Sequence, residues 1–368
     1  MNISKVLKCF GCMACMDKCP KQCIEITEGE LGHLYPKVIN GCIDCGLCLK
    51  VCPVENGHSF MSARHVWAVW RNDDKLRLES SSGGMASAIA EHIIERGGVV
   101  YGCAFVPEFS FKHIRCATKA DLKRLKGSKY VQSDMQGVYK SIAKDLREGL
   151  KVLFIGTPCQ VAGINTFLSK AHDNLFTIDL ICHGVPSVKI LKESLPKEIV
   201  CRGLDSVEFR VNTEYRFSAK SGISGTVFER PLNKDLFLKA FFTALTYRKS
   251  CYTCKFAQEQ RISDITLGDF WGLDETVAKD SEKGVSLCMG NTERGCRIVN
   301  EIRGTTMIER PASEAVSGNR QLRKPMQENF RTKIFRTLYP KFGFRPSVIF
   351  SIPEIVIKSK IVSLLKRN

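Results

Sequence analysis

The sequence predicts an α/β protein, α+β overall, in which a small cysteine-rich domain precedes a larger region of alternating strands and helices. Three observations predict this class. Two short runs near the N-terminus share one cysteine spacing, strand-like and helix-like apolar patterns alternate after residue 64, and hydrophobic residues make up 44% of the 368 residues against 25% charged ones. That balance is typical of a folded globular chain and excludes a mostly disordered one.

The cysteine-rich region contains two runs of the same form. Residues 9–20 read CFGCMACMDKCP and residues 42–53 read CIDCGLCLKVCP, and both follow C-x2-C-x2-C-x3-C-P, the spacing of bacterial two-cluster ferredoxins. Three cysteines of each run hold one 4Fe-4S cluster, and the fourth reaches the other cluster. We therefore predict a bacterial-type dicluster ferredoxin domain over residues 1–57. Its first cluster would be held by Cys9, Cys12, Cys15 and Cys52, and its second by Cys42, Cys45, Cys48 and Cys19.

Zinc binding or plain core packing is the alternative interpretation of these eight cysteines. It is disfavoured because structural zinc sites do not need two matching triplets. The N-terminus reaches its first cysteines without an apolar signal segment, and no stretch has 18 uncharged apolar residues, so we expect a cytoplasmic protein without disulfides. Cys23 lies outside both runs, and we interpret it as a packed thiol.

The region after residue 63 alternates between strand and helix periodicity. Strands are predicted at residues 65–72, 99–106, 151–156 and 175–181, and helices at residues 82–98 and 136–149, after residue 160, at residues 187–195 and at residues 235–250. Ligands of open α/β sheets bind beyond the carboxyl ends of the strands. The loops that follow these strands are therefore the expected place for a site.

Two segments of this region have the composition of an anion site. Residues 79–84 read ESSSGG before the first helix, where hydroxyls, free backbone N–H groups and glycines suit a bound phosphate. Residues 125–134 read LKGSKYVQSD and bring lysines, serines and a glycine together. A simple serine N-cap with flexible glycines is the alternative for the first segment.

Four further cysteines form another candidate metal site. Cys251 and Cys254 make a C-x2-C pair, which supplies only half of a four-thiolate site. Cys159 and Cys182 follow predicted strands and are the candidates for the other half. We assign the four to a third 4Fe-4S cluster; zinc at the same thiolates and a core role for Cys159 are the alternatives. Core packing is predicted for the remaining five, Cys103, Cys116, Cys201, Cys288 and Cys296.

The chain resembles the family of coenzyme F420 hydrogenase and dehydrogenase beta subunits in five segments that occur in this order: ESSSGG, KGSKYVQSD, LFIGTPCQVAG, IDLICHGVPS, and the C-x2-C pair followed by RISDITLGDFWG. It resembles a bacterial member that carries an N-terminal dicluster ferredoxin. The resemblance implies FAD in the central αβ region, with iron-sulfur clusters beside it. The flavin contacts it implies are Ser81, Ser82, Gly83, Gly84, Lys126, Ser128, Lys129, Tyr130, Gly156, Thr157 and Pro158.

The domain organisation follows from these segments. We predict an αβ FAD-binding domain over residues 63–245, a C-terminal αβ region over residues 246–330 that supplies the C-x2-C ligands, and a basic, amphipathic helical tail over residues 331–368.

The combination of domains predicts a converter between one-electron and two-electron chemistry, because clusters pass single electrons whereas a flavin accepts two. We predict an FAD-dependent iron-sulfur oxidoreductase that exchanges electrons with a ferredoxin-like or F420-type partner and acts on an organic substrate of unknown identity. His183 is the candidate catalytic residue, since imidazole titrates near neutral pH; a structural role in its loop is the alternative. The rival interpretation is an electron-transfer beta subunit of a larger redox complex, without a substrate of its own.

The formal net charge of +17 raises the question of nucleic-acid binding. Three clusters at about −2 each and a flavin pyrophosphate offset roughly 8 of these charges, and no nucleic-acid partner is predicted. The remaining basic residues concentrate in the tail, which either rests peripherally on an anionic membrane surface or an acidic partner, or packs on its own domain. The residues concerned are Ile355, Val356, Ile361, Val362, Leu364 and Leu365, interleaved with Lys358, Lys360, Lys366 and Arg367.

Overall fold

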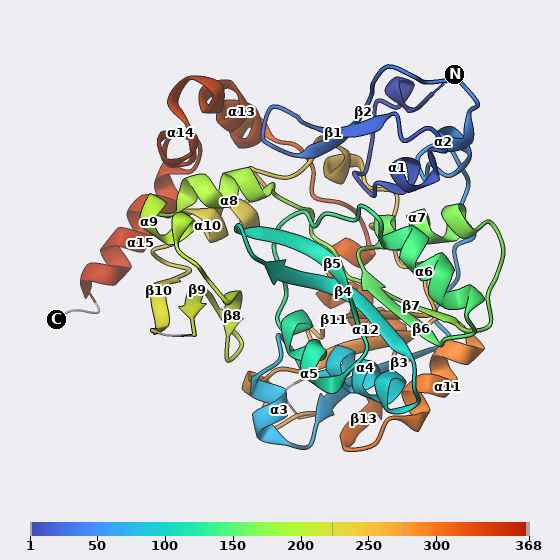
Figure 1. The fold of residues 1–368 in the computed structure, drawn as a ribbon. Coiled ribbons are helices and arrows are strands. Elements are labelled where there is room, and N and C mark those ends of the chain that lie inside the picture. The colour runs from blue at the N-terminus through green and yellow to red at the C-terminus, as the bar shows by residue number, and fades with distance from the viewer. Residues whose placement is uncertain (1, 223, 275, 366–368) are drawn as a thin grey trace.

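The computed structural model describes residues 2–222, 224–274 and 276–365, with side chains described as far as residue 359. The centre of the molecule is one large mixed sheet (Figure 1). Its strands are β3 (His65–Arg71), β4 (Val99–Val106), β5 (Ser110–Cys116), β6 (Val152–Gly156), β7 (Leu175–Leu180), β11 (Ile265–Asp269), β12 (Ser286–Gly290) and β13 (Thr305–Glu309). In the described part of the chain these eight strands lie in the order β13-β3-β12-β11-β7-β6-β4-β5. The predicted α/β class is confirmed.

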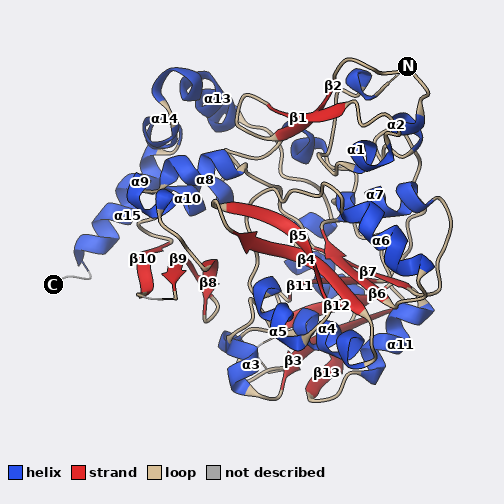
Figure 2. Cartoon of the chain, in the orientation of Figure 1, coloured by secondary structure: helices blue, strands red, loops and turns tan. Residues whose placement is uncertain are grey.

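Four neighbouring strands of the sheet, β4, β6, β7 and β11, run parallel. Helices cover both faces of this part (Figure 2). Val152 and Phe154 of β6 pack with α6 (Val138–Arg147) and α7 (Pro158–Leu168), whereas Leu153 packs with α4 (Met85–Glu95) and α11 (Glu293–Glu301). Strand β6 is therefore apolar on both sides, and the carboxyl ends of the four parallel strands open at one edge of the sheet.

The cysteine-rich domain packs on α6 and α7. It consists of a 3-10 turn η1 (Ile3–Lys5), the short helices α1 (Ala14–Lys18) and α2 (Leu47–Lys50), and an antiparallel hairpin of β1 (Ile24–Glu28) and β2 (Leu34–Val38). The Asp17 carboxylate accepts hydrogen bonds from the backbone N–H groups of Gly137, Tyr139 and Lys140, which satisfies donors at the start of α6. The Tyr139 hydroxyl donates to the Cys12 carbonyl at 2.7 Å. These contacts hold the first cysteine run against the αβ region.

A second group of helices and strands follows β7 along the chain and packs against the helices of the tail. It comprises α8 (Val188–Ser194), α9 (Lys197–Cys201), a three-stranded antiparallel sheet of β8 (Ser206–Val211), β9 (Glu214–Ser221) and β10 (Gly225–Pro231), and α10 (Leu236–Phe242). Phe209, Phe217 and Phe237 form a buried cluster with Phe335 and Val348 of α13 (Phe330–Phe342) and α14 (Phe344–Ser351). The shorter helices α3 (Asp74–Leu78), α5 (Lys119–Leu122) and α12 (Ala312–Gly318) lie around the large sheet.

The large sheet takes strands from both sides of residue 245, because β11, β12 and β13 pair with β7 and β3. The predicted domain boundaries stay predictions, and the boundary at residue 245 does not separate two sheets.

The tail ends in α15 (Pro353–Leu365). Val356 is buried in the cluster of α13 and α14, Ile355 packs partly against it, and Lys358 is exposed. The other side chains predicted to form an amphipathic stripe lie outside the described residues: Lys360, Ile361, Val362, Leu364, Leu365, Lys366 and Arg367. Within the described part of the chain, we find no helix whose length and apolarity would let it cross a membrane.

Two details differ from the sequence-based expectations. The helix predicted over residues 235–250 ends at Phe242, since Ala244 adopts a left-handed conformation with φ of 56° and the chain continues in an irregular segment. Cys201, predicted to pack in a core, is exposed at the last position of the five-residue helix α9. Its core assignment was wrong, whereas Cys116, Cys288 and Cys296 are buried.

Candidate functional site

The two cysteine runs adopt matching loops. The residues two and four positions after the first cysteine have positive φ in both: Gly11 and Met13 at 72° and 66°, and Asp44 and Gly46 at 48° and 73°. Met13 and Asp44 lack the freedom of glycine, so both loops accept a backbone conformation that L-residues rarely adopt. Each loop then enters a short helix that carries the third cysteine of its run.

The predicted ligand sets of the ferredoxin domain lie together in space. In the first set, burial raises the pKa of the Cys15 thiol, and the neighbouring Cys9 and Cys52 raise it further. The second set, Cys19, Cys42, Cys45 and Cys48, lines a separate recess that we call the outer site. Cys45 is exposed there, and Cys42 is partly exposed. Cys23 is buried at the same recess, with its sulfur 3.4 Å from that of Cys19.

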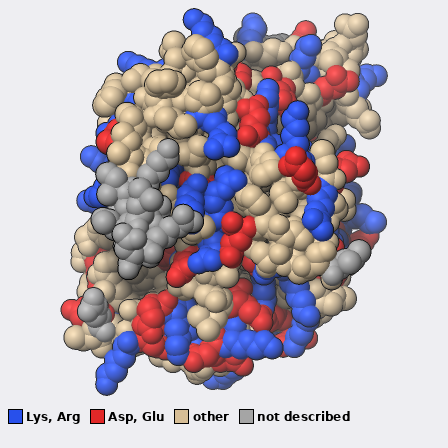
Figure 3. Space-filling model, turned by 90° about the vertical axis from the view of Figure 1, so that its left-hand side faces the viewer, with Lys and Arg blue, Asp and Glu red and all other residues tan. Residues whose placement is uncertain are grey.

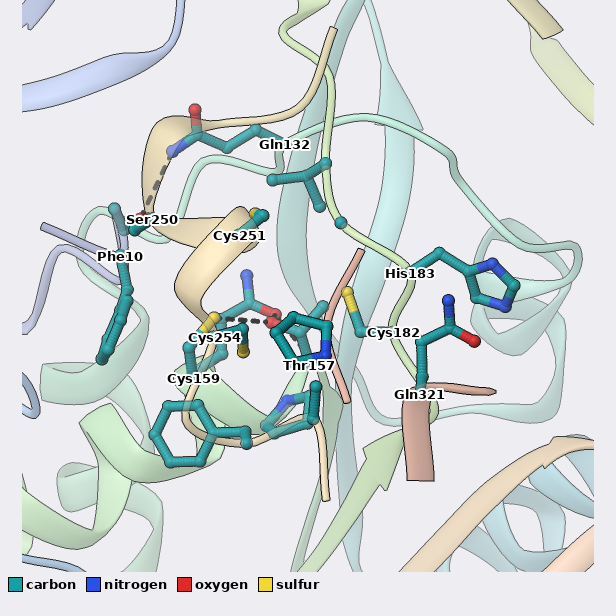
Figure 4. Close-up of a pocket in the computed structure, with 18 of the residues that line it drawn as sticks. Phe10, Gln132, Thr157, Cys159, Cys182, His183, Ser250, Cys251, Cys254 and Gln321 are labelled. Carbon is teal, nitrogen blue, oxygen red and sulfur yellow. Dashed lines mark hydrogen bonds between the residues drawn. The ribbon is translucent and has the colours of Figure 1, made fainter. Parts of the chain in front are cut away.

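A second recess, which we call the inner site, is lined by all four of Cys159, Cys182, Cys251 and Cys254 (Figure 4). The recess spans about 800 Å³, part of which is open solvent. Cys159 lies in the first turn of α7, and Cys182 follows the end of β7 by two residues. Cys251 and Cys254 lie within and just after a 3-10 helix, η3 (Lys249–Thr253). The structure therefore brings the C-x2-C pair to the ends of two neighbouring parallel strands.

The surrounding protein disfavours free thiolates at the inner site, although each of the four residues is partly accessible from the recess. Burial raises the pKa of Cys159 to about 11 and that of Cys251 to about 12. Burial raises the pKa of Cys182 well above its ordinary value, and the neighbouring Cys251, Cys159 and Cys254 raise it further. Unligated, these thiols stay protonated at neutral pH, whereas a bound metal centre would hold them as thiolates.

Among the described residues, no group of three or more His, Cys, Asp or Glu side chains is arranged to hold a single metal ion. A zinc ion holds four sulfurs about 2.3 Å from one point, whereas the ligands of a four-iron cluster each bind a different iron.

Two buried arginines stand beside the inner site, and neither was among the predicted site residues. Arg261 pairs with Asp179 of β7 at 2.8 Å, and both side chains are almost fully buried. Arg248, three residues before Cys251, is also fully buried. The sequence signal for the Arg261–Asp179 pair was an aspartate inside the otherwise apolar strand LFTIDLI, followed far along the chain by the arginine of RISD.

The three segments predicted to contact a flavin form a continuous track. The backbone N–H of Ser128 donates to the Ser81 hydroxyl at 2.7 Å, which joins the first segment to the second. The Gln160 side chain donates to the Ser133 hydroxyl at 2.9 Å, which joins the second segment to the first turn of α7. Thr157 at the N-cap of α7 and Pro158 at its first position line the inner site.

Several predicted contact residues also have structural partners. Lys126 pairs with Glu79 at 2.6 Å, and Ser82 donates to the Val285 carbonyl at 2.9 Å. The Lys129 ammonium donates to carbonyls of its own segment, and burial lowers its pKa to about 8. The Tyr130 ring stacks on Phe241 with 4.6 Å between centroids.

The glycines among the predicted flavin contacts are each required by a different feature of the local structure. Gly84 has a φ of 88° at the N-cap of α4. A side chain at Gly83 would collide with the Val69 carbonyl of β3, and one at Gly156 would meet the Phe154 ring. These two glycines permit close packing around the sheet, and their part in flavin binding stays a prediction.

His183 lies at the inner site next to Cys182. Its ring is 5.5 Å from the ring of Trp271, measured between centroids, and burial lowers its pKa while Asp269 raises it. Asp269 is held by Arg210 of β8, with two contacts to Nη1 of 2.7 and 3.0 Å. Arg210 comes from the separate three-stranded sheet and was not among the predicted site residues.

Family models match most of the chain. The models described as the N-term and the C terminus of the coenzyme F420 hydrogenase/dehydrogenase beta subunit match residues 66–140 and residues 149–315, respectively. A 4Fe-4S dicluster domain matches residues 8–56.

Individual relatives are more distant. The chain is similar to the F subunit of the F(420)H(2) dehydrogenase of Methanosarcina mazei, at 23% identity over 217 residues, which is 55% of this chain and 61% of that protein. It thus spans about three fifths of that relative's length. It is also similar to a ferredoxin of Saccharopolyspora erythraea, at 35% identity over 75 residues, or 20% of this chain and 67% of that protein. A chain of the F420-reducing [NiFe] hydrogenase complex from Methanosarcina barkeri superimposes with a TM-score of 0.48 and 16% identity, covering 71% of this chain and 91% of that chain.

Proposed function

The chain belongs to the family of coenzyme F420 hydrogenase/dehydrogenase beta subunits and carries a 4Fe-4S dicluster domain, and from this premise we propose that it is an iron-sulfur flavoprotein oxidoreductase. In this proposal the cysteines of the ferredoxin domain would hold two 4Fe-4S clusters and those of the inner site a third, and these clusters would supply single-electron transfer between a redox partner and FAD. A flavin bound beside the inner site would supply the exchange of electrons with an organic substrate.

The succession of the three thiol sets carries the proposal. Cys48 of the outer site is close enough to act electrostatically on Cys15 of the first set, and Cys159 of the inner site acts in the same way on Cys12. Each set is thus the electrostatic neighbour of the next, from the exposed Cys45 to the interior recess. Such an order suits single-electron transfer from the surface inward.

The residues at the inner site fit a third cluster. Four cysteines match its ligand count, and none is used in a disulfide among the described residues, which include all eighteen cysteines. Thr157 Oγ1 lies 3.2 Å from Cys159 Sγ, so a hydroxyl is positioned to donate to this sulfur once it is a thiolate.

The flavin proposal rests on the track of three segments. Ser81, Ser82, Gly83 and Gly84 precede α4, an eleven-residue helix whose N-terminal dipole favours a phosphate, and Lys126, Ser128, Lys129 and Tyr130 follow across the Ser81–Ser128 hydrogen bond. Gly156, Thr157 and Pro158 lead to the inner site. Bound there, FAD supplies the conversion between one-electron and two-electron transfer. His183 would hold or release a proton at its imidazole, which the low local polarity keeps mostly neutral at pH 7.

Rapid mixing under anaerobic conditions tests this proposal. The isolated protein should be yellow-brown and release FAD on denaturation. A reduced dicluster ferredoxin should reduce its flavin, and Cys159→Ser should retain FAD but slow this step to below about a tenth, the equivalent of about 1.4 kcal/mol in the barrier. Cys201→Ser, at an exposed cysteine outside every thiol set, is the matched control. A protein that binds neither iron nor flavin after anaerobic reconstitution would contradict the proposal.

The alternative is an electron-transfer subunit without its own substrate, and the name of one relative, which is one subunit of a dehydrogenase, favours it. The purified chain decides between the two. Turnover of a small molecule by the chain alone supports the enzyme, whereas flavin reduction that requires a second protein supports the alternative.

We also propose that the tail contacts an anionic membrane through the outward side of α13 and α14. Phe330, Phe342 and Phe350 are exposed there, the last by 68%. Residues 330–359 contain six basic residues and one acidic residue. Figure 3, which faces this side, shows a broad uncharged area at the level of α13 and α14, with Lys and Arg around it. Exposed aromatic rings with surrounding positive charge suit the headgroup region of anionic lipids.

Flotation of the intact protein with phosphatidylserine vesicles tests the membrane contact. Binding should be lost in the double variant Phe342→Asp, Phe350→Asp and retained in Leu7→Asp, which changes an exposed apolar side chain of the ferredoxin domain. Equal flotation of all three proteins would overturn this proposal.

A further inference from the structure

Arg248 is a buried positive charge for which the described residues provide no carboxylate. Its side chain is fully buried. Nε donates to the Cys9 carbonyl at 2.7 Å and Nη1 donates to the Leu34 carbonyl at 2.9 Å, while Nη2 has no acceptor. The guanidinium carbon lies 3.9 Å from the centroid of the Tyr35 ring. Neutral carbonyls and an aromatic face thus surround a charge that does not titrate in proteins.

Other buried arginines show what is missing. Arg77 pairs with Asp280 at 2.8 Å, and Arg261 pairs with Asp179 at the same distance. An unpaired buried charge is strongly destabilising, so a protein that keeps one at a fixed position has a negative group to offset it. The side chains around Arg248 include His33, which burial keeps neutral and which cannot supply that charge.

The negative groups that fit this position are thiolate clusters. Arg248 holds the carbonyl of Cys9, a predicted ligand of the first ferredoxin cluster, and its positive charge reaches Cys159 and Cys251 of the inner site. It therefore lies near members of both sets of four cysteines. A 4Fe-4S cluster with four thiolates carries about −2 when oxidised and about −3 after it gains one electron.

We propose that Arg248 is a positive charge shared by the first ferredoxin cluster and the inner-site cluster, and that it makes both easier to reduce than they would be without it. For the inner site, this inference rests on the third cluster of the proposed function. When a cluster takes one electron from its donor, its negative charge grows by one, and a fixed cation nearby in a medium of low polarity stabilises that extra charge. Arg248 keeps its proton and forms no new bond. It is a positioning charge rather than a catalytic residue.

The outer site provides an internal reference. Its four cysteines lie around a separate recess, and its neighbours include Asn2 and Asp44 instead of a buried guanidinium. Arg248 should therefore favour the arrival of electrons at the two inner clusters and leave the outer cluster unchanged.

The test is an EPR-monitored redox titration of the full chain with its clusters reconstituted. Arg248→Gln should lower the midpoint potentials of the first cluster and the inner-site cluster. At the wild-type midpoint potential, the ratio of reduced to oxidised cluster should fall about tenfold at each of the two, which corresponds to a shift of about 59 mV for a one-electron couple. The outer cluster should keep its midpoint. Arg248→Lys keeps the charge and should stay near wild type, and Arg77→Gln, at a buried arginine that pairs with Asp280 away from the cysteine sets, is the matched control.

A second variant covers the case in which Arg248→Gln does not fold. Gln132 Oε1 lies 3.5 Å from Arg248 Nη1 and accepts a hydrogen bond from the Leu34 backbone. Gln132→Glu would place a carboxylate beside the intact guanidinium and should lower the same two midpoints. Unchanged midpoints in a variant with a full complement of iron would overturn the role of Arg248 while leaving the proposed function intact. Absence of four irons from the wild type would instead contradict the third cluster, and the effect on the first cluster would still be measurable.

Discussion

The outer site and the inner site contain the same number of predicted ligands but differ in their surroundings. At the outer site, Cys45 is exposed and the Asn2 amide lies 3.8 Å from Cys42 Sγ, so solvent and surface groups reach the sulfurs. At the inner site, the thiols face a recess whose surroundings include the buried Arg261–Asp179 pair and Arg248. Surface ligands suit exchange with a partner protein, whereas fixed interior charges set the energy of an electron that has already arrived.

Removal of one cysteine ligand of the outer site should have the largest effect, which we expect on iron content and on the rate of flavin reduction. In Cys45→Ala we expect the loss of about four irons, because the entry cluster would no longer be held. The rate of flavin reduction by ferredoxin should fall below about a tenth of the wild-type rate, equivalent to about 1.4 kcal/mol in barrier height. Iron analysis and rapid mixing measure both. The inner-site signals should persist, and a variant with full iron content and wild-type rate would show that Cys45 is not a ligand.

Breaking the buried Arg261–Asp179 pair beside the inner site should have the next largest effect. Arg261→Gln leaves the Asp179 carboxylate buried without its cation, which should lower the free energy of unfolding by about 3–5 kcal/mol. Chemical denaturation followed by circular dichroism measures this loss. Arg297→Gln removes an exposed pair with Glu293 and should change stability by less than about 0.5 kcal/mol. Equal losses in the two variants would contradict the difference between interior and surface charges.

The smallest effect concerns the contact that joins the ferredoxin hairpin to the loop after Cys182. His33 Nε2 lies 2.8 Å from the Val185 carbonyl, and burial lowers the pKa of His33 from 6.5 to about 3. The unfolded chain therefore binds a proton at higher pH than the folded chain does. Stability from neutral His33 is fully present above pH 6.5 and decreases as the pH falls toward 3.

Between pH 6.5 and pH 5, protonation of this histidine in the unfolded chain should lower the free energy of unfolding of the wild type by about 1.6 kcal/mol. His33→Gln should remove that part of the pH dependence, whereas His65→Gln, at an exposed position, should keep it. Denaturant titrations at several pH values measure the slopes, and parallel slopes for wild type and His33→Gln would refute the assignment.

Sequence reasoning succeeded where the signal was local. The spacing of Cys9 to Cys19 and of Cys42 to Cys52 predicted the dicluster domain, which the family match confirms, and the apolar run before Gly156 predicted a strand that the structure contains. Cys159 and Cys182 were predicted to meet because carboxyl ends of parallel strands share one edge, and both line the inner site.

The rest depended on contacts between distant parts of the chain. Arg210 comes from a three-stranded sheet that has no motif, and its partner Asp269 ends a strand of the large sheet. Arg248 gained its meaning only from burial beside Cys9, which lies 239 positions earlier. Cys201 was misassigned because a strand-like or helical context in the sequence did not reveal that the end of its helix faces solvent.

The iron content of the reconstituted chain tests the central claim most directly. With three 4Fe-4S clusters, the wild type should hold about twelve irons, Cys159→Ser about eight, and Cys103→Ser, at a thiol of β4 outside the inner site, about twelve. Eight irons in the wild type, or full iron in Cys159→Ser, would contradict a third cluster at the inner site.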